Sequence, residues 1–132
     1  MCRITENDCR TIMARLDTKL KYPPYFDGDL QAKQKRLRGW QDGLERAKTF
    51  AAFQIRPGSL SEREYRRLQK RALNMAESPL YTLEDKKVLE AEGWKMAMNR
   101  FSNILAAFWQ EKLRLEEQMR PCYKEVERRT TP

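Results

Sequence analysis

The sequence predicts an all-α fold of about four helices, with one long C-terminal helix as the packing spine. No run of alternating Val, Ile and Thr residues is present, and five glycines in 132 residues leave few tight turns, so a sheet is not expected. Residues 81–121 contain no proline before Pro121 and carry apolar residues at helical spacing. A chain of this length supports one modest core, so we expect a single domain over residues 1–132.

The first helix is expected over residues 5–20, with Thr5 or Asn7 as its N-cap. Its apolar stripe recurs at helical spacing and comprises Cys9, Ile12, Met13, Leu16 and Leu20. Two prolines and three aromatic residues follow in residues 22–26. The prolines favour an extended backbone, and we expect the aromatic rings to pack this loop onto the core.

The second helix is expected over residues 30–53, after a turn and N-cap at residues 27–29. Its expected apolar side comprises Leu30, Leu37, Trp40, Leu44, Ala47, Phe50, Ala51 and Phe53. Gly39 and Gly43 lie four residues apart in mid-helix, and each costs about 1 kcal/mol relative to alanine. They either let another helix approach closely or mark a break, and the sequence supports both interpretations equally.

The third helix begins after a stop and turn at residues 55–58. Ser61 and Glu64 have the spacing of a capping box, and Leu60 is placed to pack on Tyr65. Its expected buried side comprises Tyr65, Leu68, Ala72 and Met75. Ser78 and Pro79 end it before Thr82, the N-cap expected for the long fourth helix.

The fourth helix carries the richest apolar stripe in the chain, which comprises Trp94, Met98, Phe101, Ile104, Leu105, Phe108, Leu115 and Met119, with Trp109 beside it. We expect the helix to end at Pro121, with residues 110–132 projecting as an arm or tail. The aromatic part is either an intramolecular core or, in part, a docking surface for a partner. Gly93 leaves open a break near the start of this helix.

The residue types present argue against an enzyme. The chain has no histidine, which removes the commonest general base and zinc ligand. No glycine-rich phosphate loop or nucleophile elbow is found, so we expect no catalytic, metal-binding or cofactor-binding residues. Cys2, Cys9 and Cys122 form no CxxC pair and are interpreted as free thiols in a reducing, intracellular compartment. The longest apolar run is far too short to span a membrane, and the N-terminus lacks the apolar core of a secretory signal.

A basic stripe on the third helix is the candidate contact face. The chain has a net charge of +8, which favours an acidic partner: nucleic acid, an anionic lipid surface or an acidic protein. The expected basic contact face comprises Arg63, Arg66, Arg67, Lys70 and Arg71. Because no recognition-helix pattern accompanies it, a solvated or protein-facing role is favoured over sequence-specific reading of nucleic acid.

Residues 57–86 resemble one family, the small, all-helical, matrix-side subunit of the mitochondrial cytochrome bc complex (respiratory complex III). The resemblance rests on Arg56-Pro57, on the arginine-rich run at residues 66–73, and on the linker at residues 80–85. A charged helix at residues 111–120 follows at a comparable distance. The resemblance covers about half of the chain. It implies a non-catalytic subunit that braces the complex on the matrix face of the inner membrane.

These observations predict a non-catalytic structural or interaction subunit of a larger assembly, with other protein subunits as its partners. A respiratory complex on the mitochondrial matrix side is the assembly that the resemblance implies. The alternative is a basic nucleic-acid-binding protein of the phage, plasmid or ribosome-associated kind. The two differ in salt dependence, because phosphate contacts release counterions and an apolar protein interface does not.

Overall fold

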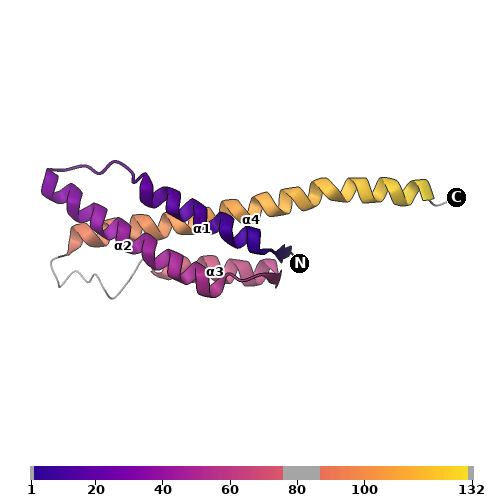
Figure 1. The fold of residues 1–132 in the computed structure, drawn as a ribbon, viewed down its shortest axis with the longest axis horizontal. Helices are drawn as coiled ribbons and strands as arrows, with labels where there is room; N and C mark the ends of the chain where they lie inside the picture. The colour runs from indigo at the N-terminus through magenta and orange to yellow at the C-terminus, as the bar shows by residue number, and fades with distance from the viewer. Residues whose placement is uncertain (1, 76–86, 131–132) are drawn as a thin grey trace.

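The computed structural model describes the backbone of residues 2–75 and 87–130 and the side chains of residues 3–75 and 87–118. Along the chain the elements are β1 (Cys2–Ile4), α1 (Glu6–Lys21), α2 (Leu30–Gln54), β2 (Gly58–Leu60), α3 (Glu62–Asn74) and α4 (Val88–Thr130). Figure 1 shows these helices lying roughly along one direction, with the long α4 extending past the others. The prediction of an all-α fold with a long C-terminal helix is confirmed.

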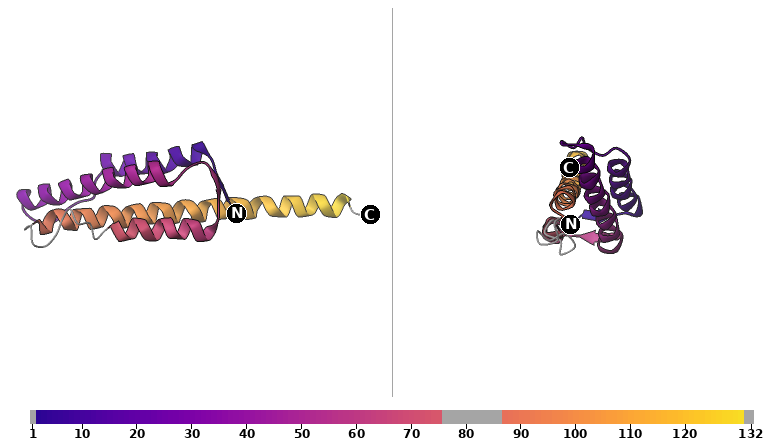
Figure 2. Two further views of the ribbon diagram at one scale, coloured as in Figure 1. Left: turned by 90° about the horizontal axis from the view of Figure 1, so that it is seen from below. Right: turned by 90° about the vertical axis from the view of Figure 1, so that its left-hand side faces the viewer.

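Helix α4 lies at the centre of the arrangement. Both α2 and α3 pack directly on α4, and α1 packs on α2. Figure 2 shows α1 and α3 on opposite sides of the molecule, with α2 and α4 between them. This arrangement leaves one side of α3 and one side of α1 open to solvent.

The contact between α2 and α4 is made through glycines on both helices. A Cβ atom at Gly39 would lie 1.8 Å from the Glu90 carbonyl oxygen, and a Cβ at Gly93 would lie 2.0 Å from the Arg36 carbonyl oxygen. At Gly43 the added atom would lie 2.7 Å from the Cβ of Ala97. Both helices are continuous through these positions. The glycines therefore serve close backbone approach, and they do not break either helix.

The aromatic stripe of α4 forms the core with α2, α3 and α1. Trp94, Met98, Phe101, Ile104, Leu105, Phe108 and Trp109 are all buried. Trp40 of α2 is buried beside them and donates from its indole N–H to the Lys19 carbonyl at 3.3 Å. The phenyl rings of Phe50 and Phe101 meet edge to face, with their centroids 5.9 Å apart. Packing within the chain thus accounts for this stripe.

Three apolar residues expected in the core are exposed instead. Leu30, the first residue of α2, is 71% exposed. Phe53 is 66% exposed because it lies about 200° around the helix from the buried Ala51. Leu115 is 60% exposed, on the part of α4 that extends past the other helices. Helical spacing gives the side of a helix but not how far along it a neighbour reaches.

The sequence did not predict the small antiparallel ribbon. Strand β1 pairs with β2 in the register Cys2 with Leu60 and Ile4 with Gly58. The strands have three residues each, too few to show an alternating pattern, and they come from distant parts of the chain. Ile4 is nonetheless buried in the core. The ribbon therefore fixes the N-terminus to the start of α3.

The helix caps follow the sequence closely. Thr5, not Asn7, caps α1: its hydroxyl accepts from the Asp8 N–H at 3.1 Å, and the Asp8 carboxylate accepts from the Thr5 N–H at 2.8 Å. Ser61 caps α3 by accepting from the Glu64 N–H at 3.2 Å. The Glu64 carboxylate, however, lies 3.0 Å from the Ser61 hydroxyl rather than on its backbone N–H. The expected capping box of α3 is thus only half formed.

The loop between α1 and α2 is held by one aromatic ring, not three. Phe26 is buried and meets the Trp40 indole edge to face at 6.3 Å. Tyr22 and Tyr25 are exposed, with Lys21 and Lys33 lying over their respective rings. The prolines keep the loop extended, and Phe26 is the one of its three aromatic residues that reaches the core.

The ends of α4 differ from the prediction. The expected start at Thr82, and the boundary at Ser78 and Pro79, lie outside the described residues. The helix does not end at Pro121 but continues to Thr130. A proline removes one backbone donor from a helix, but most of residues 124–129 are Lys, Glu or Arg, which favour helices.

Residues 111–113 of the expected arm contact the other elements. Leu113 is partly buried against the core, and the Lys112 ammonium donates to the Arg3 carbonyl at 2.9 Å and to the Asp8 carboxylate. Burial opposes ionisation of Asp8, but hydrogen bonds from Lys112 and Thr5 outweigh it and lower the pKa of this carboxyl. Side chains beyond the body are thus described only for the short stretch up to residue 118.

We predict that Gly93→Ala destabilises the protein by about 2 kcal/mol or more, although alanine has the higher helix propensity by about 1 kcal/mol. The added methyl group would overlap the Arg36 carbonyl oxygen, so α2 and α4 would have to separate. The measurement is the free energy of unfolding in urea. Ala106→Gly, at an exposed position of the same helix, measures propensity alone, with an expected loss of about 1 kcal/mol. A Gly93→Ala protein as stable as the wild type would contradict the close contact.

Candidate interaction surface on helix α3

The buried side of α3 fixes which residues face outward. Tyr65, Leu68 and Ala72 are buried against the bundle. The Tyr65 hydroxyl donates to the Leu105 carbonyl of α4 at 2.7 Å. The Tyr65 ring stacks on the Trp109 indole with centroids 4.3 Å apart and an interplanar angle of 16°. These contacts fix the rotation of α3 about its axis.

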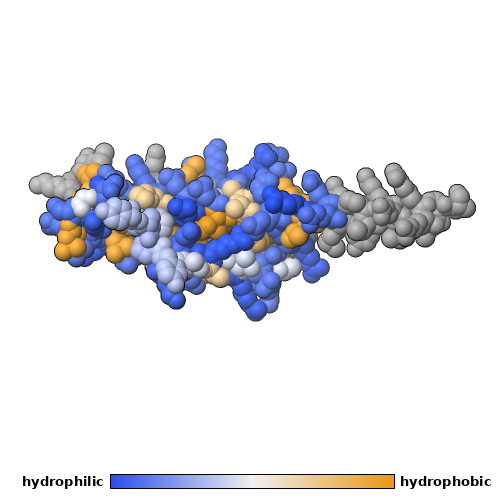
Figure 3. Space-filling view, turned by 90° about the horizontal axis from the view of Figure 1, so that it is seen from above, coloured by the Kyte–Doolittle hydropathy of each residue, from blue (hydrophilic) through white to orange (hydrophobic). Residues whose placement is uncertain are grey.

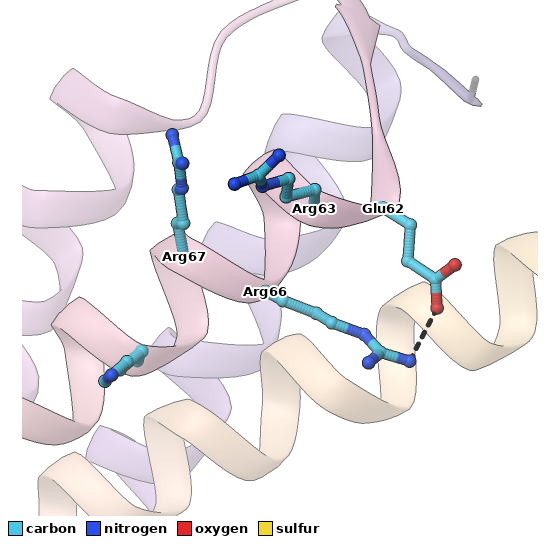
Figure 4. A pocket seen from close by; sticks show the side chains of 5 residues that line it. Glu62, Arg63, Arg66 and Arg67 are labelled. Atoms are coloured by element: carbon cyan, nitrogen blue, oxygen red, sulfur yellow. Dashed lines mark hydrogen bonds and ion pairs between the residues drawn. The ribbon is translucent and has the colours of Figure 1, made fainter.

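The outward side of α3 carries four cationic residues, Arg63, Arg66, Arg67 and Lys70, which we call the α3 basic face. All four are exposed, and with Glu62 they line an open hollow of about 450 Å³. Figure 4 shows Arg63 and Arg67 extending from α3 into solvent, while Arg66 turns to Glu62. The Arg66–Glu62 ion pair measures 2.8 Å. In the described part of the chain, Arg63, Arg67 and Lys70 have no ion-pair partner.

Arg71, the fifth residue expected on this face, belongs to the contact between α2 and α3. Its Nη1 donates to the Gln54 side-chain oxygen at 3.2 Å. Its guanidinium carbon lies 5.5 Å from the centroid of the Phe50 ring. The structure therefore keeps four of the five predicted residues together and assigns the fifth to packing.

The expected stripe on α4 is a packing surface. Its six candidate residues are at most 4% exposed, so none is available to a partner; they are Trp94, Met98, Phe101, Leu105, Phe108 and Trp109. The Trp94 indole N–H donates to the Met75 carbonyl at 2.6 Å, which ties the end of α3 to α4. The Trp109 indole N–H, in contrast, has no hydrogen-bond partner among the described residues.

The described residues contain no group of three or more cysteine, aspartate or glutamate side chains placed to hold a metal ion. Burial, and then the nearby Asp8 carboxylate, raise the pKa of the Cys9 thiol, which donates to the Ile55 carbonyl at 3.4 Å. A thiol of raised pKa is a poor nucleophile at neutral pH. Within these residues no helix has the length and apolarity needed to cross a membrane.

One cluster of cations was missed by the sequence analysis. Arg15 and Lys19 of α1 lie beside Arg100 of α4 along a second open hollow. On α1 alone the two residues are an ordinary pair four positions apart. Arg100 is more than 80 residues away, so only the packing of α1 alongside α4 brings the three together.

Comparisons with models of protein families, with curated proteins and with solved structures found no match to this chain. The α3 basic face is therefore interpreted from its own chemistry. Arginine presents a planar fork of donors that pairs with carboxylate or phosphate oxygens. The α3 basic face is therefore suited to bind an anionic surface that is large enough to contact several of its cations at once.

We predict that Tyr65→Phe changes the alkaline stability of the protein. Burial raises the pKa of Tyr65 above its ordinary value of 10.0, so above pH 10 the unfolded chain loses this proton while the folded protein keeps it. Tyr65 therefore stabilises the fold below pH 10, and this contribution is lost as the pH rises above 10. One proton corresponds to a slope of about 1.4 kcal/mol per pH unit.

At pH 7 the free energy of unfolding of the Tyr65→Phe protein should be lower by about 1 kcal/mol, because the hydrogen bond to the Leu105 carbonyl is lost. Above pH 10 its stability should fall less steeply than that of the wild type. Urea unfolding between pH 7 and pH 11 measures both effects. The exposed Tyr25→Phe is the control and should change neither. If stability falls with pH equally steeply in Tyr65→Phe and in the wild type, the Tyr65 hydroxyl ionises as readily in the folded protein as in the unfolded chain, which would contradict the prediction.

Proposed function

We propose that this protein is a non-catalytic structural or interaction subunit of a larger assembly, and that the α3 basic face docks on an acidic surface of a partner protein. The observation that carries the proposal is the exposure of Arg63, Arg67 and Lys70 without ion-pair partners in the described residues. They stand on a helix whose other side is fixed in the core. A fixed array of cations favours an equally ordered set of anions.

The dimensions of the face support a macromolecular partner. From Arg63 to Lys70 the helix rises about 10 Å, at 1.5 Å per residue, and the hollow between the side chains is open. A small ligand is normally held in a pocket that buries most of its surface. An acidic helix or loop of a partner would instead span the four cations, with its carboxylates meeting the guanidinium groups.

Nucleic acid is the alternative ligand for the α3 basic face, because phosphate oxygens also pair with arginine guanidinium groups. Base stacking needs exposed aromatic rings. The nearest aromatic residue on α3, Tyr65, is buried. The exposed Tyr22 and Tyr25 lie in the loop between α1 and α2. The described part of the face therefore offers phosphate contacts without base contacts, which favours the protein partner.

The resemblance of residues 57–86 to the helical matrix-side subunit of respiratory complex III makes that class of assembly the first to test. Such a subunit would contribute contacts and no chemistry. Its basic face would then meet acidic segments of neighbouring subunits on the matrix side of the inner membrane.

We predict that Arg63→Glu combined with Arg67→Glu releases the partner. The tagged protein would be purified from its own cells, with and without nuclease, and its partners identified by mass spectrometry. Charge reversal should weaken capture at least about tenfold, or about 1.4 kcal/mol. Arg38→Glu combined with Arg46→Glu, at two exposed positions of α2, is the control of equal charge and should retain the partner.

The outcomes separate the alternatives. A fixed set of subunits that survives nuclease and is lost only with the α3 variant supports the proposal, and respiratory proteins among them would support the resemblance. Partners lost after nuclease, with a log–log salt slope near −0.9 per phosphate contacted on duplex DNA, would establish the nucleic-acid-binding alternative. Equal capture by the two double variants would exclude the α3 basic face as the docking site.

A further inference from the structure

A groove between α1 and α4 carries three cations and no acidic residue in its lining. Arg15 and Lys19 border it on α1, and Arg100 borders it on α4, around a volume of about 440 Å³. Arg15 is fixed by its Nη2, which lies 2.7 Å from the Glu111 carboxylate. Its guanidinium carbon also lies 5.9 Å from the centroid of the Phe108 ring. Lys19 and Arg100 have no ion-pair partner among the described residues, so they are the cations open to a ligand.

The floor of this α1–α4 groove is apolar, with one buried and one exposed residue. Ile104 and Ala107 of α4 line it, with Thr18 and Asn103 beside them. Ile104 is 8% exposed, and none of the large exposed hydrophobic residues lines the groove. Figure 3 looks onto the α1 side of the molecule and shows hydrophobic surface near its middle, bordered by hydrophilic surface. The groove thus combines a narrow apolar floor with a cationic rim.

The shape of the groove follows from how α1 meets α4. The two helices are joined through Asp8 with Lys112 in the first turn of α1, and through Arg15 with Glu111 at the middle of α1. Farther along, α2 lies between α1 and α4 and forms the main contact with each. The floor is therefore left uncovered beside Thr18 and Lys19. An uncovered stretch that runs alongside two helices has the form of a site for a third helix.

We propose that the α1–α4 groove binds an acidic amphipathic helix of a partner protein. Its carboxylates would face Lys19 and Arg100, and its apolar side chains would pack on Ile104 and Ala107. A membrane fits less well, because interfacial binding needs large apolar side chains that project from the surface, and none lines this groove. The groove is also too open to enclose a small molecule. It lies across the molecule from α3, so this proposal does not depend on the α3 basic face.

The test uses two libraries of amphipathic helical peptides of about 18 residues, or five turns, displayed on phage and selected against the full-length protein. One library carries Asp and Glu on its polar side, and the other carries Lys and Arg. Ala107→Trp fills the floor of the groove. Ala106→Trp, at the next residue, is exposed but does not line the groove, so it controls for the added indole. Circular dichroism and thermal unfolding establish that both variants fold.

We expect enrichment from the acidic library only. The selected peptides should bind Ala107→Trp at least about tenfold more weakly than the wild type, and Ala106→Trp should bind them unchanged. Arg100→Glu should also weaken binding, whereas Arg114→Glu, an exposed residue farther along α4, should not. No preference for acidic peptides, equal binding to the two tryptophan variants, or groove-dependent binding to phosphatidylserine vesicles but not to peptides would overturn the proposal. If only the α3 variant, Arg63→Glu combined with Arg67→Glu, lost binding, the peptides would bind the α3 basic face and not the groove.

Discussion

The close contact between α2 and α4 is the constraint on which the rest of the structure depends. Gly39 on α2 and Gly93 on α4 face the backbone of the other helix, with no room for a methyl group between them. With the backbones this close, Trp40 of α2 and Phe101 and Leu105 of α4 are buried in the same core. Three helical glycines cost stability in propensity, and the buried apolar area that they permit offsets this cost.

The excess positive charge of the chain is divided between structural and free cations. Arg15, Arg36, Arg71 and Lys112 each join two elements through contacts with Glu111, Glu92, Gln54 and Asp8, respectively. Ion pairs between exposed groups contribute little stability, but these contacts fix neighbouring elements relative to one another. Other cations have no such role: Arg63, Arg67 and Lys70 stand on the α3 basic face, and Lys19 and Arg100 border the α1–α4 groove. Part of the net positive charge of +8 is therefore concentrated in two local groups of cations.

These two arrays lie on opposite sides of the molecule, which bears on the kind of interaction protein proposed. A protein that binds one partner needs only one ordered binding face. Two cationic faces held apart by one rigid pair of helices suit a protein that connects two acidic segments of an assembly. Most of the large apolar side chains of α4 are buried in the core, so both surfaces present mainly charge, and the groove adds a small apolar floor.

The sequence alone determined the elements with strong local signals. The caps at Thr5 and Ser61, the helical spacing on α3 and the aromatic stripe of α4 gave the fold class, the helices and most of the core, because these signals depend on residues within a few turns of one another. The same spacing placed four residues of the α3 basic face correctly. It also assigned Arg71 to that face, because spacing does not show that α2 brings Gln54 and Phe50 beside it.

The tertiary structure decided what depends on segments that are distant in the chain. It decided that Gly39 and Gly93 serve close approach, because each needs the other helix as its neighbour. It paired β1 with β2, two strands too short to leave a periodic signal, and it brought Arg100 beside Lys19. A periodic pattern records only which side of a helix is apolar. Which helix covers that side, and how far along it, is set by packing between segments far apart in the sequence.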